Sequence, residues 1–386
     1  MWETNPLSAL CDVLDSRRKP ITKKDRSPGP YPYYGATGIL DYVEGYLFDE
    51  KLVLIGEDGA KWGAGDNSAF SIDGKTWVNN HAHVIRPKRN KVLDKWLIYY
   101  LNGEDLSDFI TGMTVPKLNQ GKLREIPIPL PPIPEQQRIV AILDQAFADI
   151  EKARANAEKN LKNARELFDS YLNQVFSQRG EGWVESELFD HVKFIDYRGK
   201  TPKKTQEGLR LITAKNVRMG YLKKTPEEFV AAESYDEWMT RGIPEKGDIL
   251  FTTEAPLANV AQLDTSEKGV FAQRIITMQP NRSVLDDAFL KYLLMSQPVQ
   301  ERILKKGTGA TVTGIKASLL KKIIIEYPFQ LSEQRRYVNT LDVLDRKVNQ
   351  LEVVFSKKLE SLDELKKSLL HQAFSGELTK TEGMVA

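Results

Sequence analysis

The segment Glu135-Gln-Gln-Arg-Ile-Val-Ala-Ile-Leu-Asp144 returns 198 residues later as Glu333-Gln-Arg-Arg-Tyr-Val-Asn-Thr-Leu-Asp342. The two copies continue without a gap to Ser177 and Ser375, and 15 of 43 positions are identical. Both end on a matching phrase, Leu172-Asn-Gln-Val-Phe-Ser and Leu370-His-Gln-Ala-Phe-Ser. A duplication spaced this widely indicates two similar units related by a pseudo-two-fold axis. Two related surfaces suit an elongated target with two separate sites better than they suit one catalytic pocket.

The repeated segments are predicted to be long helices. Apolar residues recur at steps of three and four along both copies, with one irregularity at the same place in each. This spacing is typical of a coiled-coil seam with a stutter. The alternative, two ordinary amphipathic helices on separate domains, does not account for the shared register. Helices of about 45 residues would be rods of roughly 65 Å. The expected seam residues are Leu143, Ile150, Leu161, Phe168, Leu341, Val348, Phe355, Leu359 and Leu362.

The two remaining blocks alternate short apolar runs with Gly, Pro and Asn turns, which is typical of mixed α/β structure. We expect strands at 51–56, 76–85, 248–252 and 270–278. The predicted fold class is α+β, with two mixed α/β globules alternating with two long helices that pair as an antiparallel coiled coil. The predicted segments are 1–130 (first globule), 131–180 (first helix), 181–328 (second globule), 329–378 (second helix) and 379–386 (tail). The globules differ more than the helices do, so we expect the helices to fix a geometry and the globules to carry different specificities.

Composition limits the classes of function. A chain of 386 residues can build two or three cores. Its 55 basic and 53 acidic residues nearly cancel, so any nucleic-acid binding must come from local patches. The single cysteine, Cys11, excludes an internal disulfide and a Cys-rich zinc site, and favours a reducing compartment. No run approaches 18 apolar residues and the start is unlike a signal peptide, so we expect a cytoplasmic protein without a membrane span.

Two patterns invite a catalytic or metal-binding interpretation. The stretch from Gly309 to Lys316 resembles a P-loop, but Ile315 separates the last glycine from the lysine, whereas phosphate binding needs them adjacent. We interpret it as a Gly/Thr-rich turn able to contact DNA phosphates. His81 and His83 are two residues apart, on one face of the expected strand, with no obvious third ligand nearby. A hydrogen-bonded structural pair is therefore favoured over a metal site, with base or phosphate contact as a minority option. We predict no catalytic residue, no metal and no cofactor on this chain.

Local basic clusters lie mainly in the globules. Such clusters neutralise DNA phosphates, and Arg, Lys, Asn and Gln side chains read base edges in the major groove. Each member alone is as readily a solvated surface residue, so the clustering supports DNA binding for the set. The candidates in the first globule are Arg17, Arg18, Lys19, Lys23, Lys24, Tyr34, His81, Lys117 and Asn119. Those in the second are Arg198, Lys200, Lys203, Lys204, Lys215, Asn216, Arg218, Arg274, Lys305, Lys306, Thr311 and Lys316.

Five motifs lie in a consistent order along the chain: Tyr34-Gly-Ala-Thr-Gly38, Asn79-Asn-His-Ala-His83, Pro131-Pro-Ile-Pro-Glu-Gln-Gln-Arg138, Arg198-Gly-Lys-Thr-Pro202 and Leu331-Ser-Glu-Gln-Arg-Arg336. With these motifs the chain resembles, over essentially its whole length, the specificity subunit of type I restriction–modification systems. The resemblance implies two target-recognition domains, each reading half of a split, asymmetric site in double-stranded DNA, and helices that set the spacer. It also implies that the helices dock two adenine-N6 methyltransferase subunits, which two restriction (motor-nuclease) subunits join in the full complex. S-adenosylmethionine, ATP and Mg²⁺ would belong to those partners.

Two other classes of function compete with this interpretation. A two-domain scaffold whose globules bind protein or carbohydrate would show no salt-dependent DNA affinity, and it leaves the basic clusters unexplained. An autonomous methyltransferase or nuclease is disfavoured, because the sequence holds no Asn-Pro-Pro-Tyr/Phe motif and no convincing nuclease carboxylate cluster. The bases read, the spacer length and the individual DNA contacts are not determined by the sequence.

Overall fold

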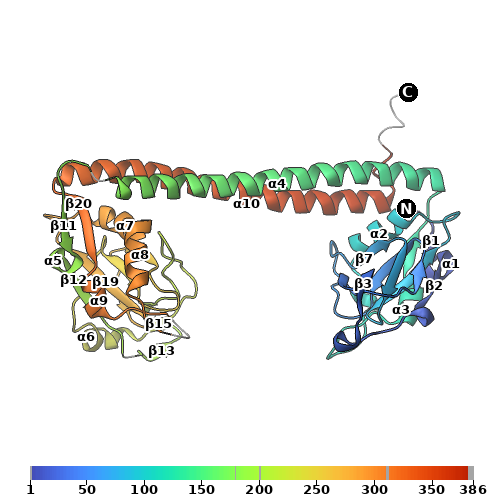
Figure 1. Ribbon diagram of the computed structural model, residues 1–386, viewed down its shortest axis with the longest axis horizontal. Helices are drawn as coiled ribbons and strands as arrows, with labels where there is room; N and C mark the ends of the chain where they lie inside the picture. Colours follow the sequence, from blue (N-terminus) through green and yellow to red (C-terminus); the bar gives the residue numbers. More distant parts are fainter. Residues whose placement is uncertain (1, 179, 200, 310–312, 381–386) are drawn as a thin grey trace, which may run out of the picture. The chain divides into compact units, whose positions relative to one another are not determined.

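The computed structural model describes residues 2–178, 180–199, 201–309 and 313–380. The chain divides into two compact units. Unit 1 comprises Met1–Glu158 and Phe355–Ala386, and unit 2 comprises Lys159–Val354. Helices α4 (Ile133–Ser177) and α10 (Leu331–Ser375) each contribute one half to each unit (Figure 1). They lie inside the predicted helical segments. Within the described ranges, no helix is long and apolar enough to cross a membrane.

Unit 1 combines short elements with the first part of α4 and the last part of α10. Its helices are α1 (Leu7–Leu10), α2 (Asp94–Gly103) and α3 (Gln120–Glu125). Its strands are β1 (Thr4–Pro6), β2 (Cys11–Val13), β3 (Pro28–Gly35), β4 (Gly38–Val43), β5 (Phe48–Asp49), β6 (Leu52–Gly56), β7 (Ala69–Ile72), β8 (Lys75–Val78), β9 (Ala82–Pro87) and β10 (Pro127–Pro129).

Unit 2 follows the same plan between the two long helices. Its helices are α5 (Leu188–His191), α6 (Tyr235–Trp238), α7 (Asp287–Met295), α8 (Gln297–Lys305) and α9 (Ala317–Lys321). Its strands are β11 (Trp183–Glu187), β12 (Val192–Asp196), β13 (Lys204–Thr205), β14 (Leu209–Ile212), β15 (Phe229–Val230), β16 (Ile249–Thr252), β17 (Val260–Gln262), β18 (Gly269–Phe271), β19 (Ile275–Pro280) and β20 (Ile324–Pro328).

The same central sheet forms the core of both units. Its order is β2-β9-β6-β7 in unit 1 and β12-β19-β16-β17 in unit 2, antiparallel throughout. A two-stranded ribbon, β1-β10 or β11-β20, accompanies each sheet. The second four-stranded sheet differs, with the order β4-β3-β8-β5 in one unit and β13-β15-β14-β18 in the other. The predicted α+β fold with an internal repeat is confirmed. The two units differ mainly in the second four-stranded sheet, which we call the outer sheet.

Two of the predicted strands are wrong in one respect. The run 76–85 is divided between β8 and β9, and the run 270–278 between β18 and β19. The chain leaves the outer sheet at each break and enters the central sheet, because β8 pairs with β3 and β9 with β6. In unit 2, β18 pairs with β14 and β19 with β16 in the same way. The predicted strands at 51–56 and 248–252 correspond to β6 and β16.

Each long helix starts on a fully buried glutamine that bonds to the globule beneath it. The Gln136 amide accepts a hydrogen bond from Leu93 N at 2.9 Å and donates to the carbonyls of Lys91 and Pro131, each at 2.9 Å. Gln334 makes the equivalent three bonds in unit 2, at 2.8 to 2.9 Å. A buried amide must be paired in this way to avoid a desolvation cost. The repeated Glu-Gln phrase therefore fixes each globule to the start of a helix.

The matching phrase at the end of each helix packs on the other globule. Phe374, near the end of α10, meets Trp96 of α2 edge-on with ring centroids 4.8 Å apart. Phe176, near the end of α4, meets Phe289 of α7 at 5.3 Å. Each unit thus buries the start of one long helix beside the end of the other, which is antiparallel pairing. Burial of each such ring contributes roughly 1.5–3 kcal/mol.

The seam between the two helices is most deeply buried close to the globules. Leu143, Ile150, Phe168 and Leu341 are buried, whereas the other predicted seam residues, Leu161, Val348, Phe355, Leu359 and Leu362, are half-buried.

Ion pairs link the exposed edges of the seam. Arg154 pairs with Asp363 in unit 1, and Arg165 pairs with Glu352 at 2.5 Å in unit 2. Because both arginines belong to α4 and both acids to α10, these charges favour pairing of the two different helices. A copy of α4 paired antiparallel with α4 would face arginine with arginine.

Candidate nucleic-acid interface

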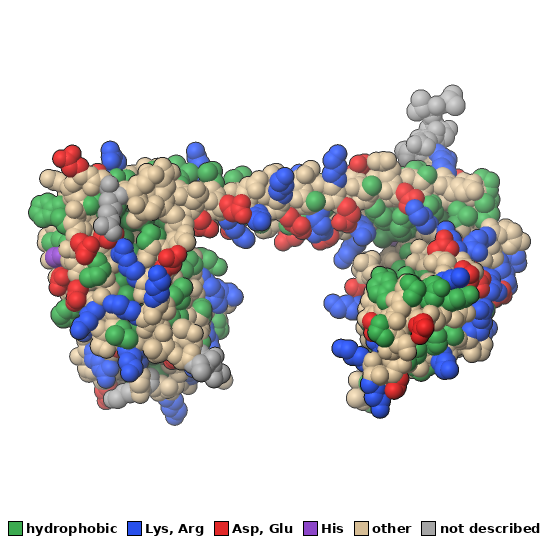
Figure 2. Space-filling view, in the orientation of Figure 1, with side chains coloured by type: hydrophobic (Ala, Val, Ile, Leu, Met, Phe, Trp, Pro, Cys, Tyr) green, Lys and Arg blue, Asp and Glu red, His purple; other side chains and the backbone are tan. Residues whose placement is uncertain are grey.

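Four predicted basic residues of unit 2, distant in sequence, meet around two adjoining hollows. Arg198 follows β12, Lys215 follows β14 and Arg274 precedes β19, and the three line a hollow of about 600 Å³ with Thr213. A smaller hollow of about 240 Å³ is lined by Arg198 and Lys316. The ends of strands from both sheets bring these side chains together. On the face drawn in Figure 2, lysine and arginine side chains are spread over both units with acidic ones between them.

The cations of this hollow are paired with carboxylates. Arg198 makes two bonds to Asp196, at 2.9 and 2.7 Å, and Lys215 lies 3.2 Å from Glu228. Burial raises the pKa of Asp196, but hydrogen bonds from Arg198 outweigh it and hold that pKa below its usual value. A hydrogen bond from Lys204 lowers the pKa of Glu228. The two carboxylates therefore stay ionised at neutral pH. The hollow itself is lined by Glu254 and Gln273 beside its cations, so it offers both donors and acceptors, as recognition of base edges requires.

The other predicted residues of unit 2 take varied positions. Lys203 and Lys305 are exposed, Lys204 pairs with Glu228 at 2.8 Å, and Lys306 donates to the Lys322 carbonyl at 2.9 Å. Arg218 is half-buried. Lys200 and Thr311 lie outside the described residues, so their predicted DNA contacts are not placed.

One prediction in unit 2 needs correction. Asn216 is only 2% exposed, and its amide bonds to Thr213 N at 3.1 Å and to the Pro226 carbonyl at 2.9 Å. It shapes the turn that presents Lys215 and has no surface with which to contact DNA itself. The sequence signal for this role is the short spacing from Thr213 to Asn216, which is typical of side chains that close turns.

In unit 1 the predicted residues divide into an exposed set and a supporting set. Lys19, Lys23 and Lys24 are exposed. The Arg17 guanidinium lies 4.6 Å from the Phe48 ring centroid, and Tyr34 is half-buried. Asn119 is half-buried and accepts a hydrogen bond from Lys122 N at 2.9 Å, which caps α3. His81 is exposed and its Nδ1 lies 2.5 Å from Asp58.

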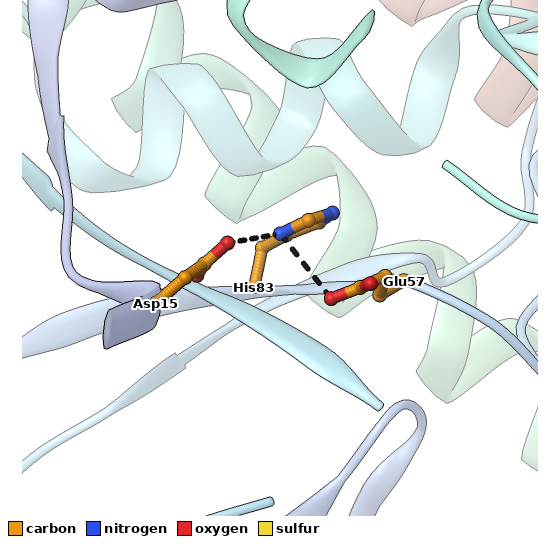
Figure 3. A group of neighbouring side chains, drawn as sticks. All are labelled: Asp15, Glu57 and His83. Atoms are coloured by element: carbon orange, nitrogen blue, oxygen red, sulfur yellow. Dashed lines mark hydrogen bonds and ion pairs between the residues drawn. The ribbon is translucent and has the colours of Figure 1, made fainter. Parts of the chain in front are cut away.

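A buried charge network lies beneath this surface in unit 1 (Figure 3). His83 is fully buried between two groups, with Nδ1 2.6 Å from the Asp15 carboxylate and Nε2 2.7 Å from the Leu118 carbonyl. Both ring nitrogens are therefore engaged by acceptor groups of the fold. Glu57 lies 3.6 Å from Nδ1.

Two further cations complete the network. Arg18 pairs with Glu57 at 2.5 Å and with Asp15 at 3.3 Å, and Lys117 pairs with Glu57 at 2.7 Å. The Arg18 side chain is only 13% exposed, so the prediction that it contacts DNA is corrected to a supporting role. Burial raises the pKa of Asp15 and of Glu57, but bonds from His83 to the first and from Lys117 and Arg18 to the second hold both below their usual values.

The same geometry bears on metal binding. Oxygen or nitrogen atoms of Asp15, Glu57 and His83 lie within 4.8 Å of one another, a spacing that a metal ion would accept. A metal ligand needs a free imidazole nitrogen, and here both ring nitrogens already contact groups of the fold, Asp15 and the Leu118 carbonyl. The arrangement favours an ion network that holds the sheet ends in place, and it agrees with the hydrogen-bonded interpretation of His83.

Sequence reasoning missed the acidic partners and some uncharged residues of the interface. Asp196, Glu228 and Glu254 were not predicted, although each pairs with a predicted cation. Gln273, which lines the larger hollow, was also missed. An acid two residues before a predicted arginine, as in Asp196-Tyr-Arg198, is the only local signal among these.

The fold and the candidate interface define a duplicated chain in which two like frameworks carry unlike polar surfaces. A family model described as the type I restriction modification DNA specificity domain matches residues 1–159 and again residues 181–361. The chain belongs to that family, and each match covers one globule with most of the long helix that follows it.

Known relatives agree with this assignment. A putative type I restriction enzyme specificity subunit of Haemophilus influenzae is 28% identical over 365 residues, which cover 90% of this chain and 89% of the relative. The specificity subunit of the type I restriction enzyme MjaVIII from Methanocaldococcus jannaschii is 23% identical, with coverage of 98% and 93%.

Two solved structures share the fold. One chain comes from work on the assembly and conformational transition of the type I R-M system, with a TM-score of 0.73, 20% identity and 98% of both chains covered. The HsdS subunit from Thermoanaerobacter tengcongensis has a TM-score of 0.54, with 19% identity and coverage of 98% and 97%.

Family membership establishes the class of function. The family is the specificity subunit of type I restriction–modification systems, which recognises DNA sequence and leaves catalysis to partner subunits. The predictions that this chain recognises DNA and is not itself an enzyme are confirmed on that ground. The alternative of a protein- or carbohydrate-binding scaffold gains no support.

Proposed function

We propose that each unit reads one half of a split, asymmetric site in double-stranded DNA. The observation that carries the proposal is a shared framework with unlike residues at matching sheet positions. Where unit 1 presents the exposed side chain of His81, strand register places the exposed side chain of Arg274 in unit 2. Two different surfaces on one framework would select two different half-sites.

The long helices would set the spacer between the half-sites. Each helix has one half in each unit, and the halves pair through a buried seam and through ion pairs such as Arg165 with Glu352. A coiled coil of fixed length is a stiff connection, so its length would determine the number of base pairs between the two half-sites.

The helices would also dock the catalytic partners. Several apolar side chains on them are exposed, among them Leu167 (63%), Val353 (55%), Val354 (58%) and Leu365 (47%). Two methyltransferase subunits and two restriction subunits are the partners we propose, and S-adenosylmethionine, ATP and Mg²⁺ would be bound by them. A complex of this kind works on DNA in the cytoplasm.

A change in helix length tests the spacer proposal. One heptad inserted at the middle of both helices adds about 10 Å, which corresponds to roughly three base pairs at 3.4 Å each. The methylated motif of a host that expresses this variant with its methyltransferase should keep both half-sites and gain about three unread positions. An unchanged spacer, with methylation intact, would show that the helices do not set it.

A further inference from the structure

The breaks that divide the two predicted strands place a polar dipeptide at the same point in each unit. In unit 1 the residues are Asn80-His81, directly before β9, and in unit 2 they are Gln273-Arg274, directly before β19. Both dipeptides lie where the chain passes from the outer sheet to the central sheet. Asn80, Gln273 and Arg274 are of the residue types that read bases in the major groove.

The backbone around both dipeptides is held by the same two bonds. In unit 1, Asn79 N donates to the Tyr34 carbonyl at 3.0 Å, and the His81 carbonyl accepts from Glu57 N at 2.8 Å. In unit 2, Ala272 N donates to the Ile212 carbonyl at 3.2 Å. The Arg274 carbonyl accepts from Thr253 N at 2.8 Å. One bond ties each dipeptide to the outer sheet and the other to the central sheet, so its position is fixed from both sides.

In unit 2 this backbone is also strained. Gln273 and Arg274 have φ angles of +43° and +69°, which side chains with a Cβ rarely adopt. Such strain persists where the surrounding structure enforces it, most often at functional sites. Both side chains line the hollow that also holds Arg198 and Lys215.

An acidic residue holds the basic member of each dipeptide. Asp58, after β6, lies 2.5 Å from His81 Nδ1, and Glu254, after β16, lies 3.3 Å from Arg274 Nε. The pair in unit 1 does not use His81 Nε2, and the pair in unit 2 does not use the two terminal nitrogens of Arg274. The side chains of His81 and Arg274 are 49% and 56% exposed, so these atoms are accessible to a duplex.

We propose that Asn80-His81 and Gln273-Arg274 are the base-reading elements of the two units, with Asp58 and Glu254 as their positioning residues. This inference rests on the proposed function, in which each unit reads one half-site. Arg274 has the geometry to donate two bonds to guanine O6 and N7, and Gln273 and Asn80 have the amide that pairs with adenine N6 and N7. The half-site read by unit 2 then contains a guanine and an adenine contacted by adjacent residues.

The test measures discrimination by the complex of this chain with its methyltransferase subunits. The wild-type complex first defines the motif, and competition binding then compares duplexes that carry each single-base change. We expect Arg274→Ala to lose roughly 5- to 150-fold of discrimination at one G·C pair of one half-site. Asn80→Ala and His81→Ala should each lose discrimination at a base pair of the other half-site, and leave the half-site read by unit 2 unchanged.

Two further variants separate reading from charge and from folding. Arg274→Lys keeps the charge but cannot donate a bidentate pair of hydrogen bonds. It should therefore retain affinity for DNA and lose discrimination at the same base pair. Lys193→Ala, at an exposed position of β12 in unit 2, should leave every position unchanged.

The outcomes distinguish this inference from the function on which it rests. Wild-type discrimination retained in all the dipeptide variants, in complexes that assemble normally, would overturn the reading assignment alone. A wild-type complex that discriminates at no position would overturn the proposed function and the assignment together.

Discussion

Replacing Gln136 by alanine should loosen the attachment of one globule to one helix. The substitution removes three hydrogen bonds of 2.9 Å from a site with no exposed surface. It leaves Leu93 N and the carbonyls of Lys91 and Pro131 without this partner. At about 1 kcal/mol for each bond, with a further penalty for buried groups left unpaired, we expect a loss of about 3–4 kcal/mol in the stability of unit 1.

A chain of two units need not unfold in one step, so the stability of each unit should be measured separately. Hydrogen exchange read peptide by peptide in increasing urea reports the opening free energy of α2 and of the start of α4. Gln334→Ala should produce the corresponding loss in unit 2 and leave unit 1 unchanged. Gln136→Glu keeps the size of the side chain but turns an oxygen toward two carbonyls, so it should be at least as costly at neutral pH.

Gln145→Ala is the matched control on the same helix. Gln145 is exposed and makes one bond to Asp149 at 3.0 Å, so its removal should change stability by less than about 0.5 kcal/mol. The reasoning is refuted if Gln136→Ala has no larger effect than this control, or if both units lose stability equally.

The acid sensitivity of unit 1 and the pairing of the helices give two further predictions. The pKa of Asp15 in the folded state is below its ordinary value of 3.8, so its network stabilises unit 1 above that pH, and this stability is lost as the pH falls through the lower folded-state value. Asp15→Asn should therefore flatten the acid side of the curve of stability against pH. The control Asp149→Asn should leave that curve unchanged. Equal slopes for both variants would contradict a stabilising role for the Asp15 network. Arg165→Glu should lower the free energy of unfolding by about 0.5–1 kcal/mol, because it places like charges together. Adding Glu352→Arg should restore most of this loss, as measured by thermal unfolding at low salt. No rescue would mean that this ion pair does not contribute to helix pairing.

The long helices were predictable because their signals are local. A buried glutamine at each start, apolar residues at steps of three and four, and a phenylalanine at each end recur in both copies. In the structure these residues make the same contacts twice, as Gln136 and Gln334 show. Duplication allowed each pattern to be checked against the other copy.

The break at 79–81 is marked by Asn79-Asn80, but the break at 272–274 was not predictable from a local signal of this kind. Apolar residues continue on both sides, and Ala272-Gln273-Arg274 contains no Gly, Pro or Asn to mark a turn. The positive φ angles of Gln273 and Arg274 are imposed by bonds to two different sheets. Only the tertiary structure supplies those bonds.

The interface was predicted in composition but not in arrangement. Clusters in the sequence identified Arg198 and Lys215, and the position that corresponds to His81 identified Arg274. Their convergence depends on strand ends that are far apart along the chain. The same limitation explains Arg18 and Asn216, whose residue types suit DNA contact but whose side chains are buried among structural partners. Residue type indicates what a side chain can bind, and burial decides whether the side chain can reach the DNA.

The most direct test of the central claim is the methylome of a host that expresses this chain with its proposed methyltransferase subunit. We predict adenine methylation at a single two-part motif, with two different half-sites separated by a fixed number of unread bases. One continuous motif, two identical half-sites, or no new methylation despite a stable complex would contradict the account of two units that each read half of a split site.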